Sequence, residues 1–180
     1  SDEPVGPIAS TPRVHQGTVF VGSFDKYLYA IDASKGRQKW KGEAENWIWS
    51  KPVISGSMVL VGSLDHKMYG FSVTTGQMRC HFVADDAIRS DAALSEDGET
   101  LIFATKSGNV YALDLPASTC SGPESLFARK WNSSFDRIES GVMAPINIKN
   151  GMAFLPAFND NLYALDVENG TLRWSKAIKE

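Results

Sequence analysis

Aromatic and charged side chains gather in three short stretches of this 180-residue chain, GEAENWIWSK, ADDAIRSD and SSFDRIESGVM. In an extended segment alternate side chains point the same way, so Trp47 and Trp49 would lie together with Ile48 opposite. Two adjacent rings can stack on a flat ligand or anchor a peptide, although they can equally close a gap between neighbouring sheets. The candidate binding residues are Trp47, Trp49, Lys51, Arg89, Asp91, Arg137 and Glu139.

The patterns of known catalytic and metal centres are missing from the sequence. His15, His66 and His81 are far apart, and no two are spaced as ligands on one strand. The carboxylates of DAIRSDAALSEDGE fall in separate turns, which is typical of solvated faces. No serine stands in a GxSxG elbow, and the stretches flanked by glycine lead into no helix that could bind phosphate. We therefore predict no catalytic residue and no metal site.

Composition narrows the class of partner. A hydrophobic content of 43% with 22% charged residues is ordinary for a globular domain. The net charge is −3 and no run of lysine or arginine could neutralise several phosphates, so nucleic acid is not an expected partner. The longest apolar stretches have four or five residues, against about 20 for a membrane span. Residues 1–7, which read SDEPVGP, are expected to be a linker or a trimmed edge.

An internal repeat determines the architecture. Four tyrosines, Tyr29, Tyr69, Tyr111 and Tyr163, are separated by 40, 42 and 52 residues. Three copies carry aspartate three positions later and three carry glycine seven later, and the first and fourth copies carry tryptophan eleven later. The third copy has nine extra residues, which predicts an inserted loop at about 116–125. The predicted repeats cover residues 8–46, 47–86, 87–137 and 138–180.

Each repeat divides into four short strands by alternation and turn residues. In the first copy these are STPRVH, TVFVGS, YLYAID and RQKWKG, separated by the turns QG, FDK and ASKG. The glycines supply the positive φ of a tight hairpin. Antiparallel units of about 40 residues that cannot bury their own faces stack as the blades of a β-propeller. The expected fold is therefore all-β.

The pattern GSFDKYLYAIDASKGRQKW, nearly repeated as AFNDNLYALDVENGTLRW, resembles the PQQ-like repeat of quinoprotein dehydrogenases and of the lipoprotein in the outer-membrane β-barrel assembly machinery. The resemblance covers residues 8–176. It implies that the tryptophan ending each outer strand packs on the next blade, so Trp40, Trp131 and Trp174 are expected docking groups. Cys80 takes this position in the second repeat and predicts a smaller, weaker contact there.

Two further features stay open at the level of sequence. Cys80 and Cys120 belong to adjacent blades, so they either form a bridge or remain as a buried thiol and a free thiol in the insertion. Propellers of the resembled family usually close with seven or eight blades. Four repeats are then either half of a longer protein or one of two copies that meet head to tail in an eight-bladed ring.

These observations favour a non-enzymatic binding or scaffolding module for a protein or peptide partner, without a cofactor. A location outside the cytoplasm, periplasmic or secreted, follows from the resemblance alone. One alternative is a fragment of a quinoprotein dehydrogenase that binds PQQ with Ca²⁺, although the adjacent cysteine pair and calcium-binding loop of such enzymes are missing. A second alternative is the ligand-sensing ectodomain of a membrane receptor.

Overall fold

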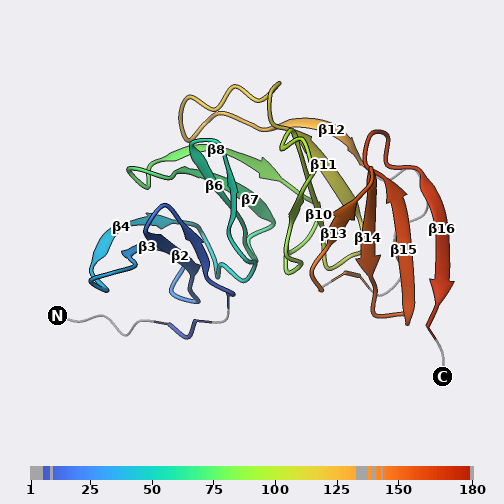
Figure 1. The fold of residues 1–180 in the computed structure, drawn as a ribbon, viewed down its shortest axis with the longest axis horizontal. Helices are drawn as coiled ribbons and strands as arrows, with labels where there is room; N and C mark the ends of the chain where they lie inside the picture. The colour runs from blue at the N-terminus through green and yellow to red at the C-terminus, as the bar shows by residue number, and fades with distance from the viewer. Residues whose placement is uncertain (1–5, 9, 133–137, 139–140, 143, 179–180) are drawn as a thin grey trace.

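The chain forms four antiparallel sheets of four strands each, side by side along an arc (Figure 1). This computed structural model describes residues 6–8, 10–132, 138, 141–142 and 144–178, and no helix occurs among them. The described N-terminal and C-terminal ends lie at opposite ends of the arc, with β16 outermost on the right. The fold is an all-β, partial propeller, as the repeats predict.

Each sheet is one blade, with its strands in sequence order from the inner to the outer edge. The blade 1 strands are β1 (Arg13–His15), β2 (Thr18–Gly22), β3 (Tyr27–Asp32) and β4 (Gln38–Glu43). The blade 2 strands are β5 (Val53–Ser55), β6 (Met58–Gly62), β7 (Lys67–Ser72) and β8 (Met78–Val83). The blade 3 strands are β9 (Ala93–Leu94), β10 (Thr100–Ala104), β11 (Val110–Asp114) and β12 (Ala128–Asn132). The blade 4 strands are β13 (Asn147–Lys149), β14 (Met152–Pro156), β15 (Asn161–Asp166) and β16 (Leu172–Ala177).

The turn before each outer strand is set by local chemistry. In blade 1 the Asp32 carboxylate accepts hydrogen bonds from the amides of Ser34 and Lys35, both at 2.9 Å. Gly36 then takes φ 65°, a conformation that costs glycine little. The outer strand pairs through a bulge at the same place in every blade, as between Ala30 and Ile31. This bulge sets the side of the sheet on which the docking residue lies.

Tryptophan side chains connect two of the three blade pairs. The indole N–H of Trp40 donates to the Val73 carbonyl of blade 2 at 3.0 Å, and Trp131 donates to Val167 of blade 4 at 2.9 Å. Each ring lies on the turn glycine of the receiving blade, where an added Cβ would come within 2.5 Å of the indole. The contact therefore requires a residue without a side chain on the receiving blade.

The hydrophobic core is divided into three clusters, one at each junction of neighbouring blades. Phe20 and Leu28 of blade 1, for example, are fully buried against Val59 and Phe71 of blade 2. Each of these clusters combines side chains of two blades, so each blade is stabilised mainly by its neighbours. The inner strands β5, β9 and β13 lie next to one another along the concave side.

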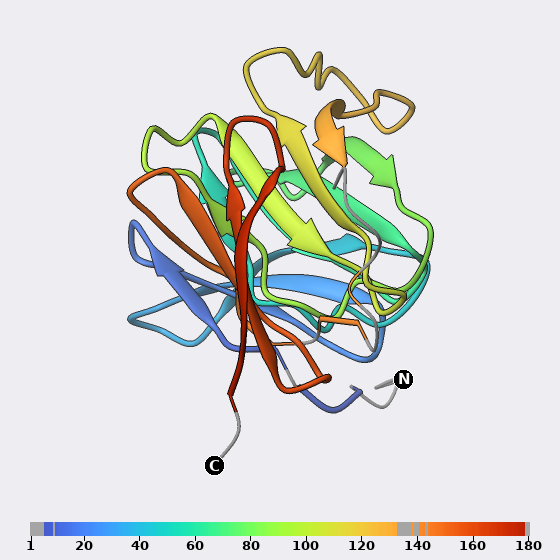
Figure 2. The same cartoon turned by 90° about the vertical axis from the view of Figure 1, so that its right-hand side faces the viewer.

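The junction of blades 2 and 3 corrects one expectation. Cys80 is not a small isolated plug, because it forms a disulfide with Cys120 of the insertion, and Cys120 is not a free thiol. The Phe127 ring lies against Gly70 and fills space at this junction. The insertion also pairs with the outer edge of β8, where the amide of His81 donates to Ser125 and the amide of Phe127 donates to His81. In Figure 2 the insertion protrudes at the top of the molecule.

Trp174 corrects a second expectation. Predicted to be buried between blades, it is 41% exposed, because no fifth blade packs on β16 within this chain. Its ring packs beside Phe154 of its own blade at 5.9 Å, as Trp40 packs beside Phe20 at 5.7 Å. Blade 4 therefore holds its tryptophan in the docking arrangement without a blade to receive it.

Gly170→Ala tests the contact between blades. Its Cβ would come within 2.5 Å of Trp131, whereas the Cβ of Gly151→Ala, at a similar φ in the same blade, would meet nothing within 4 Å. Both variants strain the backbone at a positive φ, but only Gly170→Ala also disturbs the contact with Trp131. We expect Gly170→Ala to lose about 1–3 kcal/mol more unfolding free energy than Gly151→Ala, measured by urea denaturation. Equal losses would show that the indole does not press on this turn.

Candidate loop-face binding site

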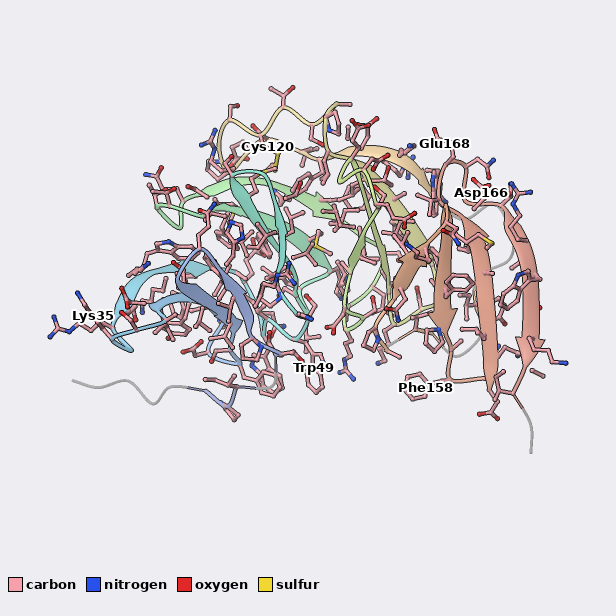
Figure 3. The ribbon with its side chains drawn as sticks, in the orientation of Figure 1. Lys35, Trp49, Cys120, Phe158, Asp166 and Glu168 are labelled. Atoms are coloured by element: carbon pink, nitrogen blue, oxygen red, sulfur yellow. A yellow bond between two sulfur atoms is a disulfide. The ribbon has the colours of Figure 1, made fainter. Side chains whose placement is uncertain are left out.

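The candidate residues lie on one edge of the blade row. The connections from the outer strand of one blade to the inner strand of the next follow this edge with the β2–β3, β6–β7, β10–β11 and β14–β15 turns. Figure 3 shows Trp49 and Phe158 along it, at the bottom of the view, with Cys120, Asp166 and Glu168 along the opposite edge. We call the edge that carries Trp49 and Phe158 the loop face.

A buried isoleucine fixes each connection. Ile48, Ile88 and Ile138 are 0–1% exposed, and the amides of Ile48 and Ile88 donate to the carbonyls of Ser23 and Ser63 at 3.1 Å. Ile48 packs so closely on Gly22 that a Cβ there would come within 2.3 Å. Sequence reasoning missed this role, although the repeated pattern of isoleucine two residues before serine, in WIWS, AIRS and RIES, carries the signal.

Because Ile48 points inward, its neighbours Trp47 and Trp49 point outward. Both stack on Phe24 of the β2–β3 turn, with ring centroids 4.5 Å and 5.1 Å away and interplanar angles of 7° and 24°. Trp47 is 43% exposed and Trp49 is partly buried. Phe24 was not among the predicted residues, because its place in the turn indicates no direction for its ring.

Arg89 extends this cluster onto the next connection. It takes the position in AIRS that Trp49 takes in WIWS, and its guanidinium lies over the Trp49 ring at 5.4 Å from the centroid. A cation over an indole face is attracted by the ring quadrupole. We call Phe24, Trp47, Trp49 and Arg89 the loop-face cluster. Phe158 of blade 4 lies on the same face and is 57% exposed, another residue that the sequence did not single out.

Asp65 holds the connection that bears the two tryptophans. Its Oδ2 accepts hydrogen bonds from the amides of Glu45 and Asn46 at 2.9 Å and from the Tyr69 hydroxyl at 3.1 Å. Burial, with the Asp65 charge, raises the pKa of the Tyr69 hydroxyl, so it remains a donor at neutral pH. The aromatic pair is thus carried by a segment fixed at several backbone atoms.

In blade 3 the carboxylate that bonds the repeat tyrosine comes from the preceding connection and not from the turn. Ser107 replaces the aspartate four residues before the repeat tyrosine, and Asp85 of the preceding connection accepts hydrogen bonds from Ser107, from Asn109 at 2.6 Å and from Tyr111 at 3.0 Å. Burial and the Asp85 carboxylate raise the pKa of Tyr111 to about 12. Asp85 therefore links its connection to the β10–β11 turn from the side of the connection, whereas Asp65 makes the corresponding link from the side of the turn.

The other predicted residues have separate surroundings. The amide of Lys51 donates to the Asp91 carboxylate at 2.7 Å, so these two meet at the entrance of neighbouring inner strands. The Asp91 carboxylate therefore joins the β4–β5 connection to the β8–β9 connection. Arg137 and Glu139 lie outside the described residues.

Among the residues that the structure describes, no three histidine, cysteine, aspartate or glutamate side chains gather closely enough to hold a metal ion. No helix in the described ranges is long and apolar enough to cross a bilayer. The loop face offers stacking surface, a guanidinium and backbone groups. These are the means of recognising another molecule.

The fold and the loop face define a PQQ-like propeller with a surface suited to binding. The sequence profile described as outer membrane protein assembly factor BamB matches residues 2–180, so the chain belongs to the BamB family. BamB of Salmonella typhimurium is 32% identical over 90% of this chain, and BamB of Escherichia coli is 31% identical over 92%. The chain spans less than half the length of these relatives, 42% and 43% respectively.

Two solved structures share the fold. The crystal structure of BamB from Moraxella catarrhalis matches 97% of this chain with a TM-score of 0.76 and 15% identity, over 54% of its own length. The computationally designed Ika4 protein matches 90% of this chain with a TM-score of 0.73 and 15% identity, over 92% of its own length. The arrangement of blades is thus one that solved proteins adopt.

Asp85→Asn tests the link between connection and turn through its pH dependence. Burial opposes ionisation of Asp85, but hydrogen bonds from Ser107, Asn109, Thr105 and Tyr111 outweigh it, so its pKa lies below the usual value. A lowered folded-state pKa gives stability that is present above the unfolded pKa, about 4, and is lost as pH falls through the folded value. We expect wild type to be more stable than Asp85→Asn at pH 5–7, with the difference shrinking below about pH 4. A difference that is constant down to pH 2 in urea titrations would contradict this assignment.

Proposed function

We propose that this chain is a non-enzymatic binding module that docks a protein partner on its loop face. The observation that carries the proposal is the loop-face cluster, in which Phe24 stacks on two tryptophans and Arg89 covers one of them. Exposed tryptophan with arginine is the composition that dominates interface energies.

The cluster is separate from the residues that hold the blades together. Trp40, Trp131 and the Cys80–Cys120 bridge join neighbouring blades, whereas Trp47 and Trp49 point away from the buried Ile48. Its aromatic surface is nevertheless rigid, because Asp65 and Ser63 hold the backbone beneath it through Asn46 and Trp47. A partner that stacks on the cluster therefore meets a surface that is already ordered, so little conformational entropy of this chain is lost on binding.

The family supports a partner from outer-membrane assembly. The relatives are named as outer membrane protein assembly factors, and the chain corresponds to less than half of each. We propose that the loop face binds another protein of the β-barrel assembly machinery, and that the chain acts as a scaffold and catalyses no reaction. The same resemblance supports a location outside the cytoplasm, and the Cys80–Cys120 disulfide agrees with it because such bonds persist in oxidising compartments.

The described residues do not fit PQQ, the cofactor of the alternative function as a quinoprotein dehydrogenase. A quinone site of that family stacks the cofactor between a tryptophan and a disulfide of adjacent cysteines. Here the two cysteines are 40 residues apart, and Cys120 lies at the edge opposite Trp49 (Figure 3). The ring system and the disulfide therefore cannot enclose one ligand.

Trp49→Ala and Arg89→Ala test the proposed surface. The probe is purified outer-membrane assembly machinery from cells that lack their own BamB, and binding to the immobilised chain is measured by interferometry. We expect each variant to weaken binding at least about tenfold, because each removes part of one stacked cluster. Lys35→Ala, an exposed change at another part of the molecule, is the control and should bind as wild type does.

Melting curves separate binding from folding in this test. Trp49 and Arg89 are not among the repeat positions that dock the blades, so both variants should melt close to wild type. If both melt normally and still bind the machinery with unchanged affinity, the loop-face cluster is not the docking surface.

A further inference from the structure

The junction of blades 2 and 3 is built without the turn that receives an indole elsewhere. In blades 2 and 4 that turn contains Gly76 and Gly170, whereas blade 3 has Ser118 at the corresponding position. The Leu115 carbonyl takes the place of the carbonyls that accept an indole N–H, and it already accepts the Ser118 amide at 3.2 Å. Cys80 and the insertion therefore form one replacement for the tryptophan contact.

The insertion leaves blade 3 and returns along the outer edge of blade 2. The His81 amide donates to the Ser125 carbonyl at 3.0 Å, and the Phe127 amide donates to the His81 carbonyl at 2.9 Å. Leu126 lies opposite His81 in a parallel bridge and is 59% exposed, so this pairing is at the solvent-facing edge of the sheet. A short pairing at such an edge opens readily unless another bond holds it.

The disulfide is the covalent part of this junction. It joins residues 40 positions apart, and the loop that it closes contains β9, β10 and β11, which are most of blade 3. A bridge across such a loop restricts the unfolded chain and so stabilises the folded one. Without the bridge the junction keeps its apolar cluster, the Phe127 ring against Gly70 and the edge pairing of the insertion. The oxidation state of the two cysteines therefore sets the strength of the junction.

The two cysteines differ in their exposure to solvent. Cys80 is fully buried, whereas Cys120 is partly exposed in the protruding insertion (Figure 3). The Arg79 guanidinium donates to the Cys120 carbonyl at 3.0 Å, so a positive charge lies near this half of the bridge. The nucleophile in disulfide exchange is a thiolate, and a nearby cation favours its approach. The structure therefore favours attack on the Cys120 sulfur.

We propose that Cys80–Cys120 is a site of thiol–disulfide exchange that takes a dithiol as its co-reactant. One thiolate of the dithiol attacks the Sγ of Cys120, the bond between the two cysteine sulfurs breaks, and Cys80 leaves as a thiolate that takes up a proton. The second thiolate of the dithiol then attacks the dithiol sulfur of the mixed disulfide and releases Cys120 as a thiol. Two electrons and two protons thus pass from the dithiol, which becomes a disulfide, to the bridge.

Reduction frees the insertion from β8 and loosens a connection of the loop face. The β8–β9 connection is held to both blades, because the Ile88 amide donates to Ser63 of blade 2 at 3.1 Å and the Lys106 amide of blade 3 donates to Ala87 at 2.9 Å. Arg89 of the loop-face cluster follows directly, so a change in how blades 2 and 3 pack is transmitted to it. The exchange itself takes place at the opposite edge and does not depend on what the loop face binds.

Reduction of the purified, folded chain tests where and how the bridge reacts. With glutathione as the probe, samples quenched in acid and digested with pepsin should carry the mixed disulfide on Cys120 and a thiol at Cys80 in mass spectra. With dithiothreitol, the reduction rate should change less than about twofold between 0 and about 1 M urea, whereas reduction through global unfolding would accelerate about tenfold or more. Thr119→Ala, an exposed change beside Cys120, is the control and should react as wild type does.

Amide hydrogen exchange measures the consequence of reduction without any partner. The amides of His81 and Phe127 should exchange at least about tenfold faster in the reduced chain, because the insertion no longer holds them. The Asp166 amide, bonded to Thr171 at 2.9 Å in blade 4, should keep its rate. Glutathione on Cys80, a bridge that dithiothreitol reduces only through global unfolding, or unchanged exchange of His81 and Phe127 after reduction would each overturn the proposal.

Discussion

Two of the three junctions between blades depend on the contact between an indole at the end of one blade and a glycine turn of the next. An indole provides a large apolar face and one N–H, and the receiving turn provides an uncovered backbone and a carbonyl. Since each core cluster lies between blades, a single four-stranded sheet buries too little to stand alone. The glycine is needed for its positive φ and for the closeness of the indole, so one residue satisfies both requirements.

This constraint separates two sets of residues. Positions that recur in every repeat form the turns and junctions, whereas in the connections between blades the residues beside the inward isoleucine vary. The same outward position is Trp49 in one connection and Arg89 in the next, and the two side chains lie together. Where a repeat loses a structural residue, another replaces it: the disulfide stands where a tryptophan is missing, and Asp85 stands where the turn aspartate is missing.

The fold could be predicted from the sequence because its signals are local and repeated. Period, turn glycines and alternation define the strands, and the position of Trp40 defines the direction in which blades dock. The Cys80–Cys120 bridge could not be derived, because it depends on the path of an insertion that folds back along β8. Phe24 and Asp85 were missed for a similar reason, since each contacts a segment more than 20 residues away. The exposure of Trp174 depends on the neighbour of the last blade, which the repeat pattern does not encode.

The five tryptophans provide the most direct measurement of this account. Indole N–H exchange with deuterium, observed by NMR with signals assigned through tryptophan-to-phenylalanine variants, reports on each ring in the assembled protein. The account predicts slow exchange for Trp40 and Trp131, whose indole N–H groups are hydrogen-bonded between blades, and fast exchange for the exposed Trp47. Exchange of Trp40 or Trp131 as fast as that of Trp47 would contradict the claim that a hydrogen-bonded indole joins these blades.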